Sequence, residues 1–532
     1  MIQFTHSSPD WQPPTSLHTH TPSLHVLNLQ HHLSHPTTVD MSAPAPVPPP
    51  AGAPGAPGGP SLPIAAALAA SGGPESAGFL NDIVAQLWPN ICVAGADMTK
   101  SIVEPMFAQM LPSPLNSLHF AKIDLGTVPL KLGNVDVHKM ASGAIKMDLD
   151  VDWDGQCDIE LDGTMIPKIG IEHVKLNGRL SILLGPLTNT IPLIGAAQVA
   201  FINPPFLKFT YTDVAAIANI GFIDRMILKV VQSIMGGMAV LPNRFLVTLD
   251  AKNDWFKTYQ LPLGILNVTI ESGSNLGESK KGKNFFKKLM HDEVDCYVDA
   301  TLGAETWRTK TIDNNRNPKW NETHGYLLCD HDQVVTVEVS NEDTATSDDA
   351  LGKATVTVKD LLLSGGSHEL ALTHNEQPTD ARINLRGQFM EFVADPASLS
   401  SQDEGTHGIL AILIASAQHI PGDRTALKPS VKVVWGDANF RTAIKTDCPG
   451  TDVQNPSFDV AYTVPLTNKV TVSGAAPVRL VLLDGENEAG AVDIPLDQVL
   501  GAPQMTLAQD FELANGASIR AAVIIRGTRS AH

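Results

Sequence analysis

The sequence lacks several features that would assign it to a class of protein directly. It has five cysteines in 532 residues, scattered and without a C-x-x-C pair. This excludes a disulfide framework and a cysteine-based zinc site, and it fits a reducing compartment. Basic residues number 37 against 56 acidic ones, a formal net charge of -19. Nucleic acid is therefore not expected as a partner, although local basic patches could still meet anionic membranes.

Long apolar runs and catalytic motifs are also missing. No run reaches the ~18–20 residues that span a bilayer, and the N-terminus lacks the basic and apolar regions of a signal peptide. The G-x-S-x-G, H-E-x-x-H and protein-kinase motifs are absent, and no local Ser, His and Asp arrangement singles out a nucleophile. We therefore expect a protein that is not an enzyme and whose membrane contact is peripheral.

Residues 1–74 have the composition of a disordered tail. The first 40 residues hold seven of the 18 histidines, and a tract rich in Pro, Ala and Gly follows Met41. Such a segment cannot bury enough apolar surface to fold. Its histidines show no regular spacing that would indicate a metal site.

Ordered structure is expected from residue 75, beginning with helices. The stretch "FLNDIVAQLW" (79–88) places its apolar residues on one helical face, and Pro89 is expected to end this helix. Ile102, Val103, Met106 and Phe107 have the same spacing and predict a second helix. A further apolar helix is predicted over residues 213–235.

A region of alternating apolar and polar residues follows the first helices. "AIKMDLDVDW" and "CDIELD" alternate over residues 144–162, which predicts two strands of an antiparallel hairpin with its turn at Gly155. The same stretch resembles an EF-hand calcium loop, but Leu161 occupies the position of the required bidentate Glu and the flanks are not helical. The acidic residues are therefore assigned to the solvated face of the hairpin. Further strands are expected over 174–184, 197–202 and 206–212.

The chain becomes uniformly rich in short β-runs beyond Leu261. Residues 262–394 and 407–528 open alike, with "LGILNVTIESGSNL" and "HGILAILIASAQHI", and the polar stretch 395–406 separates them as a linker. This weak repeat predicts two copies of one β-sandwich module.

A basic loop in the first module is a candidate membrane contact. "GESKKGKN" (277–284) nearly matches a phosphate-binding loop, but Asn284 replaces the residue that would hold magnesium. Lysines would attract anionic headgroups at ~1 kcal/mol each, and two aromatic rings could insert at the interface; the alternative is a merely solvated loop. The candidate residues are Lys280, Lys281, Lys283, Phe285, Phe286, Lys287 and Lys288.

Residues 76–250 resemble the SMP domain of extended synaptotagmins, tricalbins and plant synaptotagmins. The resemblance is carried in consistent order by "FLNDIVAQLWPNI", "FAKIDLGTVPLKLGNVDVH", "MDLDVDWDG", "LNGRLSILLGPL" and "IPLIGAAQVAFINPPFLKFTYTD". Both β modules are similar to C2 domains. The resemblance implies an α+β SMP domain of the TULIP type over residues 75–252, followed by two all-β C2-like sandwiches, the second one degenerate.

The TULIP fold implies an apolar groove that holds a glycerolipid. Burial of hydrocarbon contributes ~0.8 kcal/mol per CH₂, enough to extract a lipid without covalent chemistry. The same residues would otherwise fill a closed core. The candidate groove residues are Leu149, Val151, Leu180, Ile182, Phe201, Ile223, Ile227 and Val230.

The resemblance also implies a calcium site in the first C2-like module. Its ligand positions match Asp295, Asn341, Asp343 and Asp349. A first-loop Asp has no counterpart, and Asn341 stands where an Asp is usual, so weak binding or none is expected. In the second module Pro429 and Ser430 replace the family's Asp-Pro-Tyr, which indicates calcium-independent contacts.

Taken with the resemblance, the sequence predicts non-vesicular glycerolipid transfer and membrane tethering at membrane contact sites. The alternative is a calcium-regulated tethering scaffold that moves no lipid. The expected partners are phospholipid membranes and a second SMP domain, as a homodimer or heterodimer. The expected location is the cytosolic face of membranes, at contacts between endoplasmic reticulum and plasma membrane, although the family's usual N-terminal anchor has no counterpart in this sequence.

Overall fold

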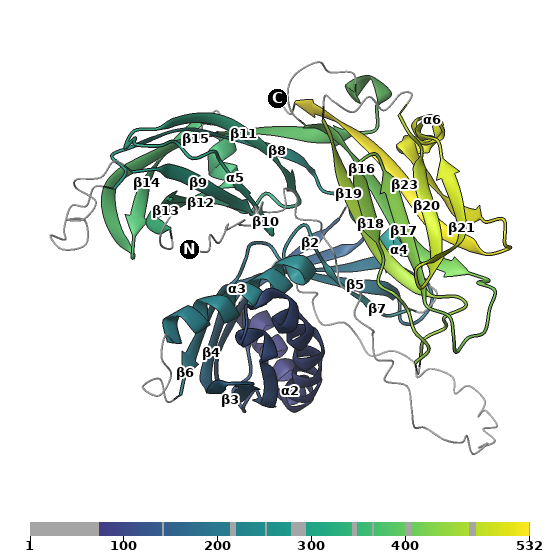
Figure 1. The fold of residues 1–532 in the computed structure, drawn as a ribbon, viewed down its shortest axis with the longest axis horizontal. Helices are drawn as coiled ribbons and strands as arrows, with labels where there is room; N and C mark the ends of the chain where they lie inside the picture. Colours follow the sequence, from purple (N-terminus) through teal and green to yellow (C-terminus); the bar gives the residue numbers. More distant parts are fainter. Residues whose placement is uncertain are drawn as a thin grey trace, which may run out of the picture.

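The computed structural model describes ten ranges of the chain: residues 74–140, 143–212, 220–250, 253–277, 294–342, 348–363, 367–399, 406–448, 450–467 and 475–530. The predicted tail lies outside these ranges apart from Pro74, and so does the basic loop that contains Lys280 to Lys288. The described chain forms an α+β domain followed by two β-sandwiches, which confirms the expected fold class (Figure 1). We call these the N-terminal domain, the central sandwich and the C-terminal sandwich.

The N-terminal domain begins with one long helix, α2 (Pro74–Met110). The prediction of two helices separated at Pro89 was wrong, since Pro89 and Pro105 both lie inside α2. A proline removes one backbone hydrogen bond from a helix. Both prolines are exposed, so water can hydrogen-bond to the carbonyls that lose their partner. The second helix predicted from sequence is present as the C-terminal half of α2.

Seven antiparallel strands form the sheet of this domain, in the order β1-β3-β4-β5-β7 with β2 beside β3 and β6 beside β4. They are β1 (His119–Asp124), β2 (Lys131–Lys139), β3 (Ile145–Gly163), β4 (Ile166–Leu187), β5 (Ile194–Phe201), β6 (Phe206–Tyr211) and β7 (Phe245–Thr248). The 3-10 turn η1 (Leu115–Ser117) precedes β1, and helix α3 (Ile220–Ala239) follows β6. Helices α2 and α3 cover part of one sheet face, as Figure 1 shows.

The hairpin predicted around Gly155 was wrong. Residues 145–163 form the single strand β3, and the turn to β4 comes after Gly163. The alternation continues unbroken across residue 155, which is what one strand requires. Gly155 is needed for packing instead of turning, because a Cβ there would lie 2.3 Å from Cε2 of Trp153. A strand also excludes the EF-hand geometry.

The central sandwich contains eight described strands and one short helix. They are β8 (Gly264–Ser274), β9 (Cys296–Leu302), β10 (Glu305–Arg308), β11 (Lys319–Leu328), β12 (Val334–Asn341), β13 (Asp349–Thr357), α5 (Val358–Leu363), β14 (Ser367–His374) and β15 (Gln377–Val393). Its interior is a closed apolar core that includes Val298, Tyr326 and Ile383, each fully buried. The short turn η3 (Pro396–Leu399) leads toward the next domain.

The C-terminal sandwich repeats this plan with another eight described strands. They are β16 (Thr406–Gln418), β17 (Pro429–Trp435), β18 (Ala438–Arg441), β19 (Ser457–Thr467), β20 (Val478–Asp484), β21 (Asn487–Ile494), β22 (Thr506–Glu512) and β23 (Ser518–Ser530), with α6 (Leu496–Gly501) and η4 (Pro503–Met505) between β21 and β22. The two sandwiches share hydrogen bonds, because residues 390–393 of β15 pair with residues 527–530 of β23. One sheet is therefore continuous from the central to the C-terminal sandwich.

The connection between the N-terminal domain and the central sandwich is itself packed. It forms the one-turn helix α4 (Trp255–Thr258), whose Trp255 lies with Leu413 and Ile524 in a buried cluster on the C-terminal sandwich. Arg520 of β23 contacts Asp254 at 3.5 Å and lies over the ring of Phe256. The connection therefore links the first domain to the third.

The helices of the described ranges are α2 to α6 and the short 3-10 turns. None of them is both long and apolar enough to cross a bilayer.

Candidate functional site

One face of the N-terminal sheet is apolar along its whole length. On β3 the odd-numbered residues face this side, and their cross-strand partners on β4 continue it: Met147 pairs with Ile182, Leu149 with Leu180, and Trp153 with Leu176. β5 extends the face further, since Val199 pairs with Ile182 and Phe201 with Leu180. The sheet thus presents an uninterrupted apolar surface to the side on which α2 and α3 pack.

The helices cover this face unevenly. At one end, Phe107 of α2 and Ile227 of α3 pack with Leu161 and Ile169 of the sheet, all four at most 2% exposed. At the other end, Leu149 and Val151 are buried while Leu180 and Ile182 are only half-buried. The first end is a closed core, and the second retains apolar surface that a ligand can contact.

The eight predicted groove residues fall into two groups on this face. Leu149, Val151, Leu180, Ile182 and Phe201 belong to the cluster at the more open end. The three residues of α3 belong to the closed cluster beside α2: Ile223, Ile227 and Val230. All eight face the apolar side, and the two groups occupy successive positions along it.

The opposite face of the sheet is polar along β3. Asp152 and Asp154 point into solvent, as predicted, and Asp150 accepts a 2.8 Å hydrogen bond from Nη1 of Arg179. Together with Lys131, Lys175 and Asn177, the side chains of Asp150 and Asp152 line an open cavity of about 520 Å³. Its mixed charges distinguish it from the apolar face and make it a poor match for acyl chains.

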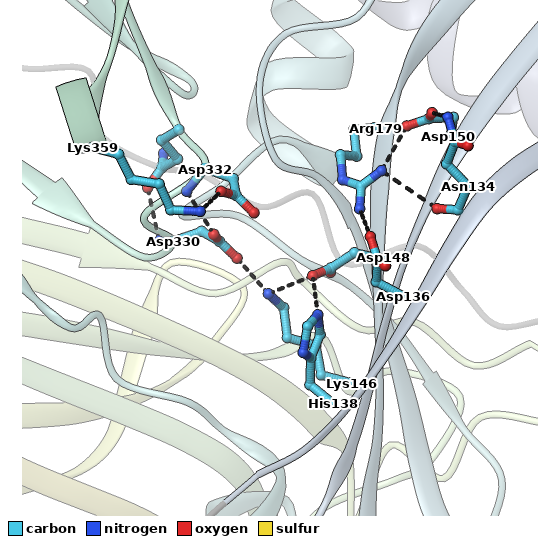
Figure 2. Close-up of polar contacts among 11 residues, drawn as sticks. Asn134, Asp136, His138, Lys146, Asp148, Asp150, Arg179, Asp330, Asp332 and Lys359 are labelled. Atoms are coloured by element: carbon cyan, nitrogen blue, oxygen red, sulfur yellow. Dashed lines mark hydrogen bonds and ion pairs between the residues drawn. The ribbon is translucent and has the colours of Figure 1, made fainter. Parts of the chain in front are cut away.

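Asp148 departs from the prediction of a solvated acidic face. It is 1% exposed, because the central sandwich packs against β3 at this point. Nζ of Lys146 lies between two carboxylates, 2.8 Å from Asp148 and 2.5 Å from Asp330 of the central sandwich, as Figure 2 shows. His138 of β2 adds a contact of 3.5 Å to Asp148. A buried ion network therefore joins the N-terminal domain to the central sandwich.

The charge of Lys146 is maintained inside this network. Burial by itself would lower the pKa of Lys146, but hydrogen bonds and attraction from Asp148 and Asp330 outweigh it, so the pKa is raised. Nearby, Asn203 donates to the Asp332 carbonyl and accepts from the Val334 amide. The contacts that Lys146 and Asn203 make with the central sandwich join residues more than 100 positions apart. No local sequence signal could have identified them.

A surface ion pair lies beside this network in the central sandwich. Lys359 pairs with Asp332, as Figure 2 shows, and this pairing lowers the pKa of the Asp332 carboxyl. Asp332 therefore contributes its backbone carbonyl to the contact between domains and its side chain to the sandwich itself.

The predicted calcium ligands of the central sandwich are only partly within the described chain. Asp295 and Asn341 are adjacent, since Oδ1 of Asn341 accepts the Asp295 amide at 2.7 Å, and Asp349 is the cross-strand partner of Asn341. One carboxylate oxygen of Asp295 already accepts the Asn314 amide. Asp343 lies outside the described residues. Within the described ranges, no group of three or more His, Cys, Asp and Glu side chains is arranged to hold a metal.

Two protein families match the N-terminal domain and the central sandwich. The model of the synaptotagmin-like mitochondrial-lipid-binding domain matches residues 73–250, and the C2 domain model matches residues 264–372. The chain contains an SMP domain and a C2 domain. The helix-covered apolar face described above lies within the SMP match, and the central sandwich contains the C2 match.

Similarity to full-length proteins extends across most of the chain. The chain is 25% identical to extended synaptotagmin-2 of Mus musculus over 468 residues and 26% identical to extended synaptotagmin-1 of Homo sapiens over 463 residues, with 83% of the chain covered in each case. It spans 53% of the first relative and 40% of the second. A solved structure of extended synaptotagmin 2, comprising its SMP domain and two C2 domains, superposes with a TM-score of 0.58 and 22% identity, covering 86% of this chain and 99% of that one. The fold is therefore that of an SMP domain followed by two C2 domains.

Proposed function

We propose that this protein carries a glycerolipid in its SMP domain between membranes that it also tethers. The observation that supports this is the apolar sheet face, which is closed by α2 and α3 at one end and left partly open around Leu180 and Ile182 at the other. Acyl chains can replace water on such a surface at a gain of ~0.8 kcal/mol per CH₂. The binding is reversible because it needs no covalent bond.

The two C2-like sandwiches would hold the protein on anionic membrane. Attraction by the basic loop around Phe285 and Phe286 supplies the first contact, and calcium plays at most a weak part. The geometry supports this weak role, because oxygens of Asp295 and Asn341 are already engaged by backbone amides. A hard cation such as calcium prefers six to eight free oxygen ligands.

The wider setting belongs to the same proposal and is taken from the resemblance to extended synaptotagmins. A second SMP domain, as homodimer or heterodimer, would lengthen the apolar path between two membranes. The cytosolic face of contacts between endoplasmic reticulum and plasma membrane is the proposed site of action. The competing proposal is a tethering scaffold that moves no lipid.

Lipid content and lipid transfer test the proposal together. Replacing Leu180 and Ile182 by Trp should fill the open end of the face, at an overpacking cost of about 1–3 kcal/mol. We expect loss of co-purified phospholipid by mass spectrometry and loss of transfer between liposomes, with tethering retained. Lys175→Trp, an exposed position on the polar side of the same strand, is the matched control. Unchanged bound lipid in the double variant would refute the groove, and tethering without transfer by the unaltered protein would favour the scaffold.

A further inference from the structure

The β4–β5 hairpin ends the SMP sheet in an exposed apolar tip. Residues 180–207 contain no Asp, Glu, Lys, Arg or His. At the turn of the hairpin, Ile191 is 92% exposed, Leu193 53% and Leu187 49%. Single exposed apolar residues are common, but a group of them on an uncharged segment indicates an interaction site. These exposed fractions refer to the whole chain, which includes both C2-like sandwiches, so neither sandwich covers the tip.

Two neighbouring segments complete this end of the sheet. Leu249, 47% exposed, lies beside the hairpin, and its amide donates to the Gly195 carbonyl at 2.9 Å. The β2–β3 connection reaches the same end, because Ile145 pairs with both Lys139 and Leu184. The exposed Lys139 lies two strands away from β4 at this end, and Asp250, next to Leu249 in the chain, also donates its amide to the Gly195 carbonyl. The tip residues, as we call them, are Leu187, Ile191, Leu193 and Leu249.

The tip is continuous with the candidate lipid site. Leu180, Ile182 and Leu184 alternate along β4 toward the hairpin on the apolar side of the sheet, and all three are half-buried. Their partners on β5 include Val199 and Ala197. A hydrocarbon chain that leaves the open end of the face would thus meet apolar side chains as far as Leu184, three residues before Leu187.

We propose that the tip residues insert into a lipid surface and that lipid enters and leaves the SMP domain at this end. This inference rests on the proposed function. A membrane fits the tip better than a protein partner does, because the exposed apolar group consists of four side chains, whereas a stable protein interface takes roughly 20–30 residues from each side. Exposed apolar side chains on an uncharged hairpin match the boundary between headgroups and acyl chains.

The test uses the full chain and vesicles of phosphatidylcholine with phosphatidylserine. The double variant Ile191→Asp, Leu193→Asp should transfer a fluorescent phospholipid between vesicles at least tenfold more slowly than the unaltered protein. It should still take up the same phospholipid from detergent micelles, because its groove is unchanged. Leu363→Asp, at an 84% exposed position in the central sandwich, controls for added charge and should transfer normally. Ile191→Trp, which suits the interface, should also retain transfer.

The outcomes separate this inference from the function on which it rests. If the unaltered protein takes up no lipid from micelles or vesicles, the proposed function fails, and the inference fails with it. If the unaltered protein transfers lipid and the double variant transfers it equally fast, the tip does not insert while the proposed function stands. Loss of micelle uptake in the double variant would also overturn the inference, because the defect would then lie in the groove.

Discussion

The packing of Trp255 on the C-terminal sandwich makes a strong prediction about domain arrangement. This residue is 9% exposed and shares a buried cluster with Ala411, Leu413 and Ile524. A buried Trp contributes about 150–250 Å² of area, which at ~25 cal/mol per Å² corresponds to about 4–6 kcal/mol. Measured Trp→Ala changes cost about 3–5 kcal/mol. Trp255→Ala should therefore weaken the docking of α4 by about 4 kcal/mol.

A loss of this size lowers the docking equilibrium constant by about three powers of ten, since each ~1.4 kcal/mol is a factor of ten. Lys257 lies in α4 with an exposed side chain, and its backbone should become accessible to trypsin once the helix is released. We expect cleavage after Lys257 at least tenfold faster in Trp255→Ala, together with a larger radius of gyration by small-angle scattering.

Trp307→Ala is the control. Trp307 stacks on His324 and packs against the core of its own domain, the central sandwich. This variant should leave both measurements unchanged. Equal cleavage rates and equal radii for Trp255→Ala and the unaltered protein would refute the argument that this side chain holds the domains together.

Three further predictions follow from buried charges and from the calcium candidates. Lys146→Met removes the cation between two buried carboxylates, leaving Asp148 with only its longer contact to His138. It should destabilise the protein by about 3–5 kcal/mol, seen as a lower thermal midpoint; a midpoint equal to that of the unaltered protein would contradict the network. Burial raises the pKa of the Asp459 carboxyl to about 6, so the unfolded chain releases this proton at lower pH than the folded chain does. The stability that the protonated carboxyl contributes is therefore fully present below the unfolded pKa of ~3.9 and is lost as pH rises through the folded pKa. In Asp459→Asn, the free energy of unfolding measured by urea titration should lose up to about 3 kcal/mol less than in the unaltered protein as pH rises between these two pKa values. Identical dependence of the unfolding free energy on pH in the two proteins would disprove this. Calorimetry of the full chain should show weak calcium binding or none, and Asp295→Asn should abolish any heat; micromolar affinity would contradict the incomplete ligand set.

Sequence patterns predicted those features that depend on neighbouring residues. Alternation over residues 144–162 identified an apolar and a polar face, and the structure retains both in β3. Apolar spacing found both halves of α2, and the long apolar segment 213–235 indicated α3. The errors at Pro89 and Gly155 arose because proline and glycine usually interrupt regular structure. Here α2 continues through Pro89, which is exposed to solvent. Strand β3 continues through Gly155, where the side chain of Trp153 leaves no room for a Cβ.

By itself the sequence determined the order of domains, the period of their strands and the apolar character of one sheet face, because side-chain direction repeats every two residues along a strand. The packing of α2 and α3 in the folded chain sets which part of that face the helices cover and which part stays open. The tertiary structure also decided that Asp148 is buried against Lys146, and that the connection around Asp254 packs on the third domain. Contacts of this kind join residues as far as 266 positions apart, as for Asp254 and Arg520, and their energies depend on burial that no local pattern encodes.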